Sequence, residues 1–154
     1  KESGMLYYTV LGTLLLAATV LMHAGGTSLW LRYLAGRYSG TGQLHRPANS
    51  FPLLASTVVF LVVLHATQIM IWALAYLFLL PSTVLNTFEE ATYFSFVTFT
   101  TLGYGDITLA GEWRIMSGIE ALNGILLAGW STAMLFAVVQ RMWQDLTRAR
   151  TQHS

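Results

Sequence analysis

Three long stretches of this 154-residue chain carry almost no charge, and they restrict its fold more than any other feature. Residues 4–31 and 47–88 contain no Asp, Glu, Lys or Arg, and residues 115–140 contain a single acid, Glu120. A helix that crosses a membrane needs about 20 apolar residues. Each stretch is long enough, so the sequence predicts an all-α membrane protein with three transmembrane helices.

Glycine and proline indicate where these helices end. Gly25 and Gly26 are expected to end the first helix or to bend it toward the membrane interface. The second helix is expected over residues 51–80, where Pro81 stops it. Residues 88–100 are too short to cross a membrane. They predict a reentrant helix that reaches half of the membrane depth, with the negative end of its dipole toward the residues that follow.

Composition supports a membrane protein and excludes several other classes. The chain is 55% hydrophobic and only 10% charged, whereas about 25% of the residues of a soluble domain are charged. A formal charge of +1 gives no basic signature for nucleic acid. The chain has no cysteine, so disulfides and thiolate metal sites are excluded. The sequence shows no nucleophile–base pair, so an enzyme is not expected.

A six-residue run, Thr101-Leu102-Gly103-Tyr104-Gly105-Asp106, directly follows the predicted short helix. A dehydrated K⁺ needs a cage of oxygen atoms, and stacked backbone carbonyls provide one. Carbonyls of adjacent residues point the same way only if the chain alternates between ordinary and left-handed conformations, which glycine adopts at little cost. The Thr101 hydroxyl would add the innermost ligands, and Leu102 and Tyr104 would point away from the pore. The predicted ion-binding residues are Thr101, Leu102, Gly103, Tyr104 and Gly105.

In this setting the run resembles the selectivity filter of a potassium channel. Residues 51–143 resemble the pore module of simple bacterial potassium channels with two core helices, and the first helix is an addition to that pattern. One chain supplies one filter strand and the cage needs four, so the resemblance implies a cyclic homotetramer. It also implies membrane lipid and monovalent cations as partners, with K⁺ as the permeant ion and no other cofactor.

The resemblance extends to the residues around the filter. Tyr93-Phe94-Ser95 occupies the place of an aromatic-aromatic-Ser cuff, and we expect the Tyr93 hydroxyl to reach Asp106. Val97 stands where some members of the family have a buried acid. Leu102 stands where Val is commoner, so the filter wall is supported differently. The residues expected to support the filter are Tyr93, Thr98, Thr100, Asp106 and Glu120.

In the third helix the resemblance places Gly124 at the position of a hinge glycine, although small residues also allow close helix contact. Residues that follow at helical spacing are expected to face a central cavity. Phe136 is the candidate for a hydrophobic constriction, since dewetting can gate a pore. Simple helix packing is the alternative for this spacing. The predicted cavity and gate residues are Gly124, Ala128, Thr132, Phe136 and Gln140.

Four of the polar residues inside the predicted spans carry a specific expectation, because polar side chains are costly there. Glu120 is either a pH- or ion-sensitive group behind the filter or a neutral acid hydrogen-bonded to the short helix, and the second interpretation is preferred. Gln68 and Asn123 lie at similar depths and are expected to bond across their helices. His65 either senses protons or makes a packing hydrogen bond, which is the preferred interpretation.

Arginines predict the topology. Three lie within residues 32–46 and three within 141–150, against the single Arg114 between the second and third spans, and the positive-inside rule assigns the two larger groups to the cytoplasm. The N-terminus and the filter loop then lie outside, where acidic residues concentrate cations at the mouth. The expected location is a bacterial inner membrane. Three parts are expected: an N-terminal helix and connector over residues 1–49, a pore domain over 50–145, and a cytoplasmic tail over 146–154.

The predicted function is a tetrameric cation channel that conducts K⁺ passively. No span carries a row of arginines, so a voltage sensor of the usual type is not expected. A Na⁺-selective or non-selective channel is the alternative within this class. A non-conducting membrane partner subunit and a transporter subunit are alternatives of other classes.

Overall fold

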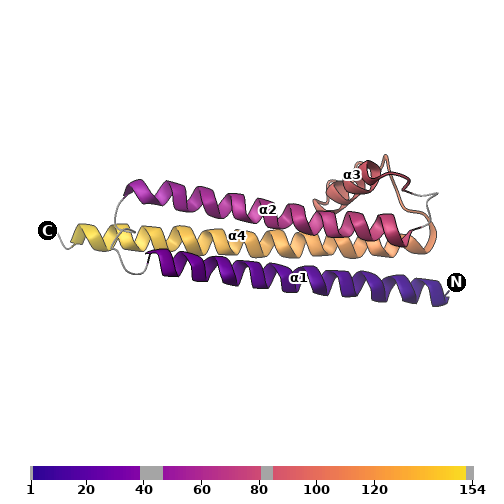
Figure 1. Cartoon of the computed structure of the whole chain (residues 1–154), viewed down its shortest axis with the longest axis horizontal. Helices are drawn as coiled ribbons and strands as arrows, with labels where there is room; N and C mark the ends of the chain where they lie inside the picture. The colour runs from indigo at the N-terminus through magenta and orange to yellow at the C-terminus, as the bar shows by residue number, and fades with distance from the viewer. Residues whose placement is uncertain (1, 39–46, 81–84, 152–154) are drawn as a thin grey trace. The chain divides into compact units, whose positions relative to one another are not determined.

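The computed structural model describes residues 2–38, 47–80 and 85–151, and its regular elements there are helices (Figure 1). α1 spans Glu2–Tyr38, α2 spans Pro47–Leu79, α3 spans Phe88–Phe99 and α4 spans Arg114–Thr151. A short 3-10 turn, η2, spans Gly111–Trp113. Within the described residues, α1, α2 and α4 are long and apolar enough to cross a membrane. The predicted all-α fold with three membrane-length helices is confirmed.

The alternative in which Gly25 and Gly26 end the first helix is wrong, because α1 continues to Tyr38. An open backbone in lipid leaves polar groups unsatisfied, which costs more than the low helix propensity of glycine. Gly26 also has a packing role. A Cβ atom there would lie 3.3 Å from Leu64 Cδ1, so glycine lets α2 approach closely.

The boundaries of the other helices differ from the prediction by a few residues. α2 begins at Pro47, where proline suits the first turn of a helix. Its last residue is Leu79, although the Leu80 amide still donates to the Tyr76 carbonyl at 3.0 Å. Pro81, the predicted stop, lies outside the described residues. α4 extends past the predicted end of the third span to Thr151.

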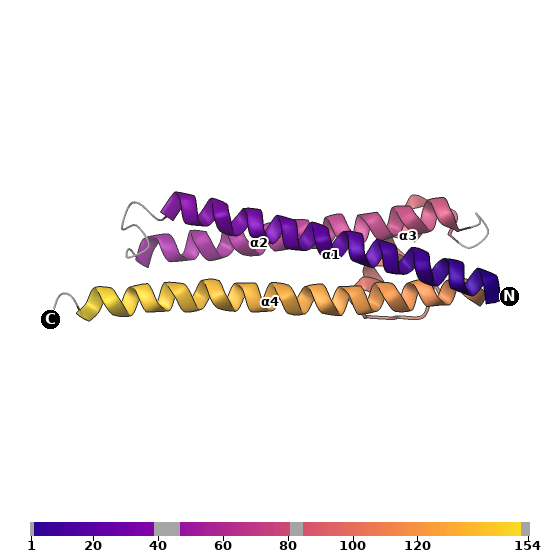
Figure 2. The same ribbon diagram turned by 90° about the horizontal axis from the view of Figure 1, so that it is seen from below.

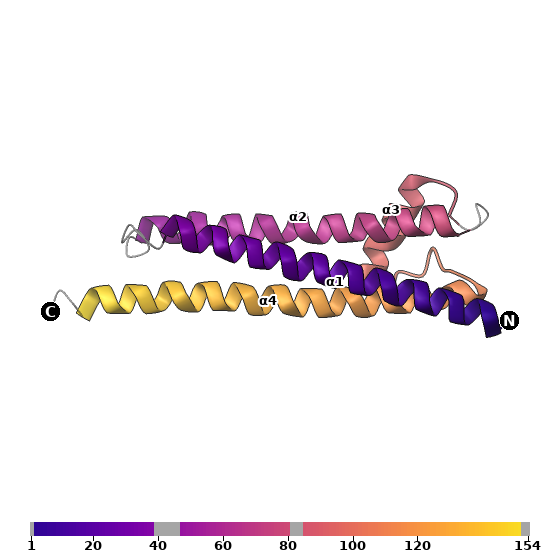
Figure 3. The same cartoon turned by 60° about the horizontal axis from the view of Figure 1, so that its bottom comes forward.

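The chain divides into two compact units. The first contains α1 up to His23, α2 from His65, α3, and α4 up to Ala128. Within it, α3 lies beside the C-terminal half of α2 (Figure 1 and Figure 2). The N-terminal part of α1 lies beside the N-terminal part of α4 (Figure 3).

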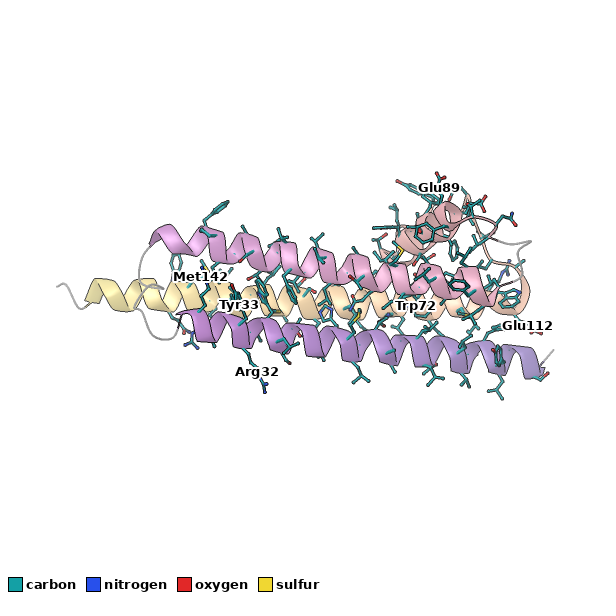
Figure 4. All side chains as sticks on the ribbon, viewed as in Figure 1. Arg32, Tyr33, Trp72, Glu89, Glu112 and Met142 are labelled. Atoms are coloured by element: carbon teal, nitrogen blue, oxygen red, sulfur yellow. The ribbon has the colours of Figure 1, made fainter. Side chains whose placement is uncertain are left out.

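The core of the first unit forms where α2, α3 and α4 meet. Trp72 and Tyr76 of α2 are fully buried, and Figure 4 labels Trp72 on this helix. The Tyr76 ring meets the Phe94 ring edge-on, with centroids 5.2 Å apart, an arrangement that aromatic pairs favour. The remaining core residues from these helices and the loop are Ile69, Ala73, Leu80, Leu85, Ala91, Phe99, Leu109, Met116 and Leu127.

The second unit contains the remaining halves of α1, α2 and α4. Trp30 of α1 stacks on Phe60 of α2, with centroids 4.6 Å apart, and its indole nitrogen donates to the Thr57 hydroxyl at 3.2 Å. Arg32 and Tyr33 follow on α1 (Figure 4). Trp30 therefore packs α1 against α2.

Candidate functional site

A complete capping box fixes the start of α3. The Thr87 hydroxyl accepts a hydrogen bond from the Glu90 amide at 3.1 Å, and the Glu90 carboxylate accepts from the Thr87 amide at 3.3 Å. The same carboxylate accepts from the Asn86 amide at 2.8 Å. Glu89, labelled in Figure 4, also lies in this first turn. Both acids stabilise the positive end of the helix dipole.

The end of α3 leads into the predicted filter through a tight backbone turn. The Thr101 amide donates to the Thr98 carbonyl at 2.9 Å. The amides of Leu102 and Gly103 both donate to the Val97 carbonyl, at 3.0 and 3.2 Å. Carbonyls at a helix C-terminus lack partners within the helix, so these bonds satisfy them. They also fix where the extended segment leaves the helix.

Every second residue of the predicted filter has a left-handed backbone. φ is 59° at Thr101, 57° at Gly103 and 81° at Gly105, while Leu102 and Tyr104 keep negative values. This is the alternation that a row of parallel carbonyls requires. The two glycines were predicted to adopt it, but Thr101 was not. A left-handed conformation costs a non-glycine residue about 1–2 kcal/mol, and such strain clusters at functional sites.

The predicted hydrogen bond between Tyr93 and Asp106 is confirmed. The Tyr93 hydroxyl donates to Asp106 Oδ2 at 2.7 Å, joining α3 to the outer end of the loop. This hydrogen bond is the main reason that the pKa of Asp106 lies below its ordinary value. The same bond raises the pKa of Tyr93 above its ordinary value. The pair fixes the outer end of the candidate filter against the helix that precedes it.

Glu120 of α4 lies behind α3 and is fully buried. Its Oε2 accepts a hydrogen bond from the Tyr76 hydroxyl at 2.6 Å, and its Oε1 meets the Ser95 hydroxyl of α3. The Ser95 hydroxyl also lies 2.9 Å from the Ile69 carbonyl. The predicted hydrogen bond from Glu120 to the short helix is confirmed, whereas Tyr76 was not anticipated as a second partner.

The Ser95 hydroxyl has one proton and lies near two acceptors, so it can donate a hydrogen bond to only one of them. If Ser95 donates to Ile69, the carboxyl of Glu120 must supply the proton that lies between itself and Ser95. A neutral carboxylic acid satisfies all three groups at once. The alternative leaves an ionised carboxylate in an apolar interior, which is strongly disfavoured.

Gly124 lies where α4 crosses the end of α3. A Cβ atom at this position would lie 2.8 Å from the Phe99 carbonyl carbon and 3.2 Å from its Cα, with the carbonyl oxygen nearer still. The neighbour is backbone, which has little room to move away. Of the two roles considered from the sequence, close helix contact is the one that this geometry supports.

The predicted bond between Gln68 and Asn123 is wrong, because both side chains bond to Thr19 of α1. The Asn123 amide donates to the Thr19 hydroxyl at 2.7 Å, and the Gln68 amide donates to the Thr19 carbonyl at 3.2 Å. Packing decided this outcome, since α1 contacts both core helices at this depth. His65 is half-buried, with its ring beside those of His23 and Phe99.

The remaining residues of the predicted cavity and gate set all lie on α4. Ala128, Thr132, Phe136 and Gln140 recur at four-residue spacing, and all four are exposed in the single chain. Phe136 is 66% exposed, and like the other exposed apolar side chains of the membrane-length helices it is free to face lipid, a partner or a pore. Leu102 and Tyr104 are likewise exposed.

The loop returns to α4 through contacts at the outer end of the first unit. Arg114 donates through Nε to the Leu109 carbonyl at 3.1 Å. The Trp113 ring contacts the Tyr8 ring of α1, with centroids 3.9 Å apart. Glu112, labelled in Figure 4, approaches Gly4 of α1. Both ends of the predicted filter are therefore held by neighbouring elements.

Sequence reasoning missed two residues of this region, in addition to the left-handed conformation of Thr101. Tyr76 carries a hydroxyl within a membrane-length span, and a polar group there needs a partner, so that hydroxyl was a usable signal. Thr19 resembles the other threonines of α1, such as Thr9 and Thr13, so nothing in the sequence distinguishes it.

Comparison with known proteins agrees with this architecture. A family model described as an ion channel matches residues 53–141, which are more than half of the 154 residues. No curated protein and no solved structure matches the chain. The match covers α2, α3, the loop and most of α4, which together form a membrane protein suited to ion transport. The chain belongs to the ion channel family, of the potassium-channel type with two core membrane helices.

Proposed function

We propose that this protein is a homotetrameric channel that conducts K⁺ passively through backbone carbonyls of residues 101–105. The observation that carries this proposal is the alternation of positive φ at Thr101, Gly103 and Gly105. Two of these residues are glycines, but the third is a threonine whose strain only a function explains. Carbonyl oxygens of this row replace the hydration shell of the ion, and the Thr101 hydroxyl adds the innermost ligand.

Four chains are needed because one chain provides a single row of oxygens. Leu102, Tyr104 and Phe136 are exposed in the single chain, and assembly around a fourfold axis would cover the first two and place Phe136 at a central constriction. The arginine distribution supports an outer filter and a cytoplasmic C-terminus. The proposed membrane is the inner membrane of a bacterium.

Ion flux into liposomes that contain the purified protein tests this proposal. We expect K⁺-driven flux that Ba²⁺ blocks, with much less flux under a Na⁺ gradient. Equal or larger Na⁺ flux would refute K⁺ selectivity and direct attention to Leu102 and the Tyr93–Asp106 pair. If neither ion gives flux, the Phe136→Ala variant is measured next, because it removes the proposed constriction. If that variant is also silent, the non-conducting partner subunit becomes the better explanation.

Two glycine variants make the test specific to the filter. Gly103→Ala adds a methyl group at φ 57°, and Gly111→Ala adds one at φ 65° outside the filter. Neither Cβ atom would meet a neighbour within 4 Å, so both variants carry a similar backbone strain and no clash. We expect Gly103→Ala to reduce K⁺ flux strongly, whereas Gly111→Ala conducts as the unmodified protein does. Equal effects would contradict the carbonyl mechanism.

A further inference from the structure

Thr19 of α1 joins both core helices of the channel module, although α1 lies outside the residues matched by the ion channel family. This residue is fully buried. Its carbonyl accepts a hydrogen bond from Gln68 of α2, and its hydroxyl accepts one from Asn123 of α4. The hydroxyl donates its own proton within α1. Thr19 therefore bonds α1 to both α2 and α4 at the same depth along the helices.

The orientation of the Gln68 amide is fixed by its neighbours. The Thr19 carbonyl can only accept, so the Gln68 atom that faces it must be the amide nitrogen. The same nitrogen lies 3.1 Å from His23 Nδ1, which must therefore carry a lone pair and accept. A second residue of α1 is thus bonded to the core module.

The contacts that α1 makes with α4 and with α2 both lie next to residues that pack against Phe99, the last residue of α3. On one side, Asn123 directly precedes Gly124, whose backbone packs on the Phe99 carbonyl group. On the other, the His23 ring lies 5.4 Å from the His65 ring, which meets Phe99 edge-on at 5.9 Å. Two residues after Phe99 the strained filter backbone begins at Thr101.

These polar contacts are costly, which argues against simple adhesion between helices. Gln68 Oε1 and Asn123 Oδ1 are buried without a hydrogen-bond partner among the residues that the structure describes. An apolar contact would hold α1 without leaving buried acceptors unsatisfied. Hydrogen bonds are directional, however, and buried polar groups can fix one register of a helix against others.

We propose that α1 positions the selectivity filter, and that Thr19 is the residue through which it does so. α1 sets the height of α2 and α4 at the level of Phe99, and thereby the point from which the filter strand starts. The inference rests on the proposed function only where its test measures ion selectivity, because that measurement needs a conducting channel. It assigns α1 a role in ion selection in addition to packing.

Thr19→Val tests the inference because valine keeps the volume and the backbone carbonyl but removes the hydroxyl acceptor. Thr13→Val is the matched control, since Thr13 is exposed on the same helix and its hydroxyl donates to the Thr9 carbonyl within that helix. We expect the K⁺/Na⁺ permeability ratio of reconstituted Thr19→Val to fall at least about fivefold, the lower range of coupling between sites. Thr13→Val should leave the ratio unchanged.

Hydrogen exchange of the amides of residues 101–105 provides a readout that does not need conduction. We expect faster exchange there in Thr19→Val than in Thr13→Val. If the unmodified protein does not conduct, the proposed function fails and exchange alone decides the inference. If Thr19→Val does not assemble, Gln68→Met, which removes the other bond to Thr19, replaces it. Exchange and selectivity equal to the control, or loss of assembly in both variants, would overturn the inference in favour of a purely structural helix.

Discussion

Replacing Gly124 by alanine distinguishes close helix contact from a flexible hinge. The added methyl group would lie 2.8 Å from the Phe99 carbonyl carbon and closer to its oxygen. Because the obstacle is the backbone of α3, no side-chain rotation relieves it. α4 must shift away from the base of the filter, or the end of α3 must move.

The expected size of this effect follows from two opposing contributions. Overpacking of a well-packed interior costs about 1–3 kcal/mol, and a backbone obstacle places Gly124 at the upper end. Alanine gains about 1 kcal/mol of helix propensity over glycine. The net loss of unfolding free energy is therefore about 2 kcal/mol. Gly118→Ala is the matched control, because its Cβ atom would meet nothing within 4 Å, and it should gain about 1 kcal/mol.

Unfolding of the purified protein in mixed micelles, followed by circular dichroism against denaturant, measures both variants. We expect Gly124→Ala to unfold at a lower denaturant concentration than the unmodified protein and Gly118→Ala at a higher one. A Gly124→Ala protein as stable as Gly118→Ala would refute the packing argument. That result would favour the hinge, at which alanine stiffens α4 without a clash.

Two further predictions concern the carboxyl groups around the filter. In Tyr93→Phe, the pKa of Asp106 should rise toward its ordinary value of about 3.9, because the hydrogen bond that lowers it is lost. At pH values above the ordinary pKa, the bond contributes to the stability of the folded protein. This contribution is lost as the pH falls through the pKa that Asp106 has in the folded protein. Carboxyl carbon NMR titration, with Tyr7→Phe as control, measures the shift, and an unchanged pKa would contradict it. Glu120→Gln should be tolerated, because an amide can donate to Ser95 and accept from Tyr76 as a neutral acid does. Glu120→Leu should cost about 1–3 kcal/mol of unfolding free energy by leaving the buried Tyr76 hydroxyl unpaired, while Ser95 keeps its bond to the Ile69 carbonyl. Equal losses in the two variants would indicate an ionised carboxylate.

The Tyr93–Asp106 bond and the capping box at Thr87 show how far local sequence reaches. The Tyr93–Asp106 bond was implied by the resemblance of these residues to the potassium-channel cuff and filter, and it joins two ends of one short segment. The capping box joins residues within one helical turn, so spacing and side-chain chemistry suffice to predict it. The same holds for Gly103 and Gly105, where a positive φ could be assigned from residue type alone. The contact of Glu120 with α3 was predictable because a buried acid in an apolar span must find a partner.

The sequence by itself determined the all-α class, the number of membrane-length helices, the position of the short helix and the family of the loop. These follow from patterns of charge, apolar length and glycine that need no knowledge of neighbours. Tertiary structure alone decided that α1 continues through Gly25 and Gly26, that Thr19 separates Gln68 from Asn123, and that Gly124 meets Phe99. It also decided the left-handed conformation of Thr101, which residue type disfavours. For the Thr19 and Gly124 contacts the physical reason is packing between segments far apart in the chain, which sets which helix faces which. In α1 the need to satisfy the backbone in lipid outweighs the low helix propensity of glycine. Thr101 lies in the hydrogen-bonded turn that ends α3, and its own propensity yields to that turn.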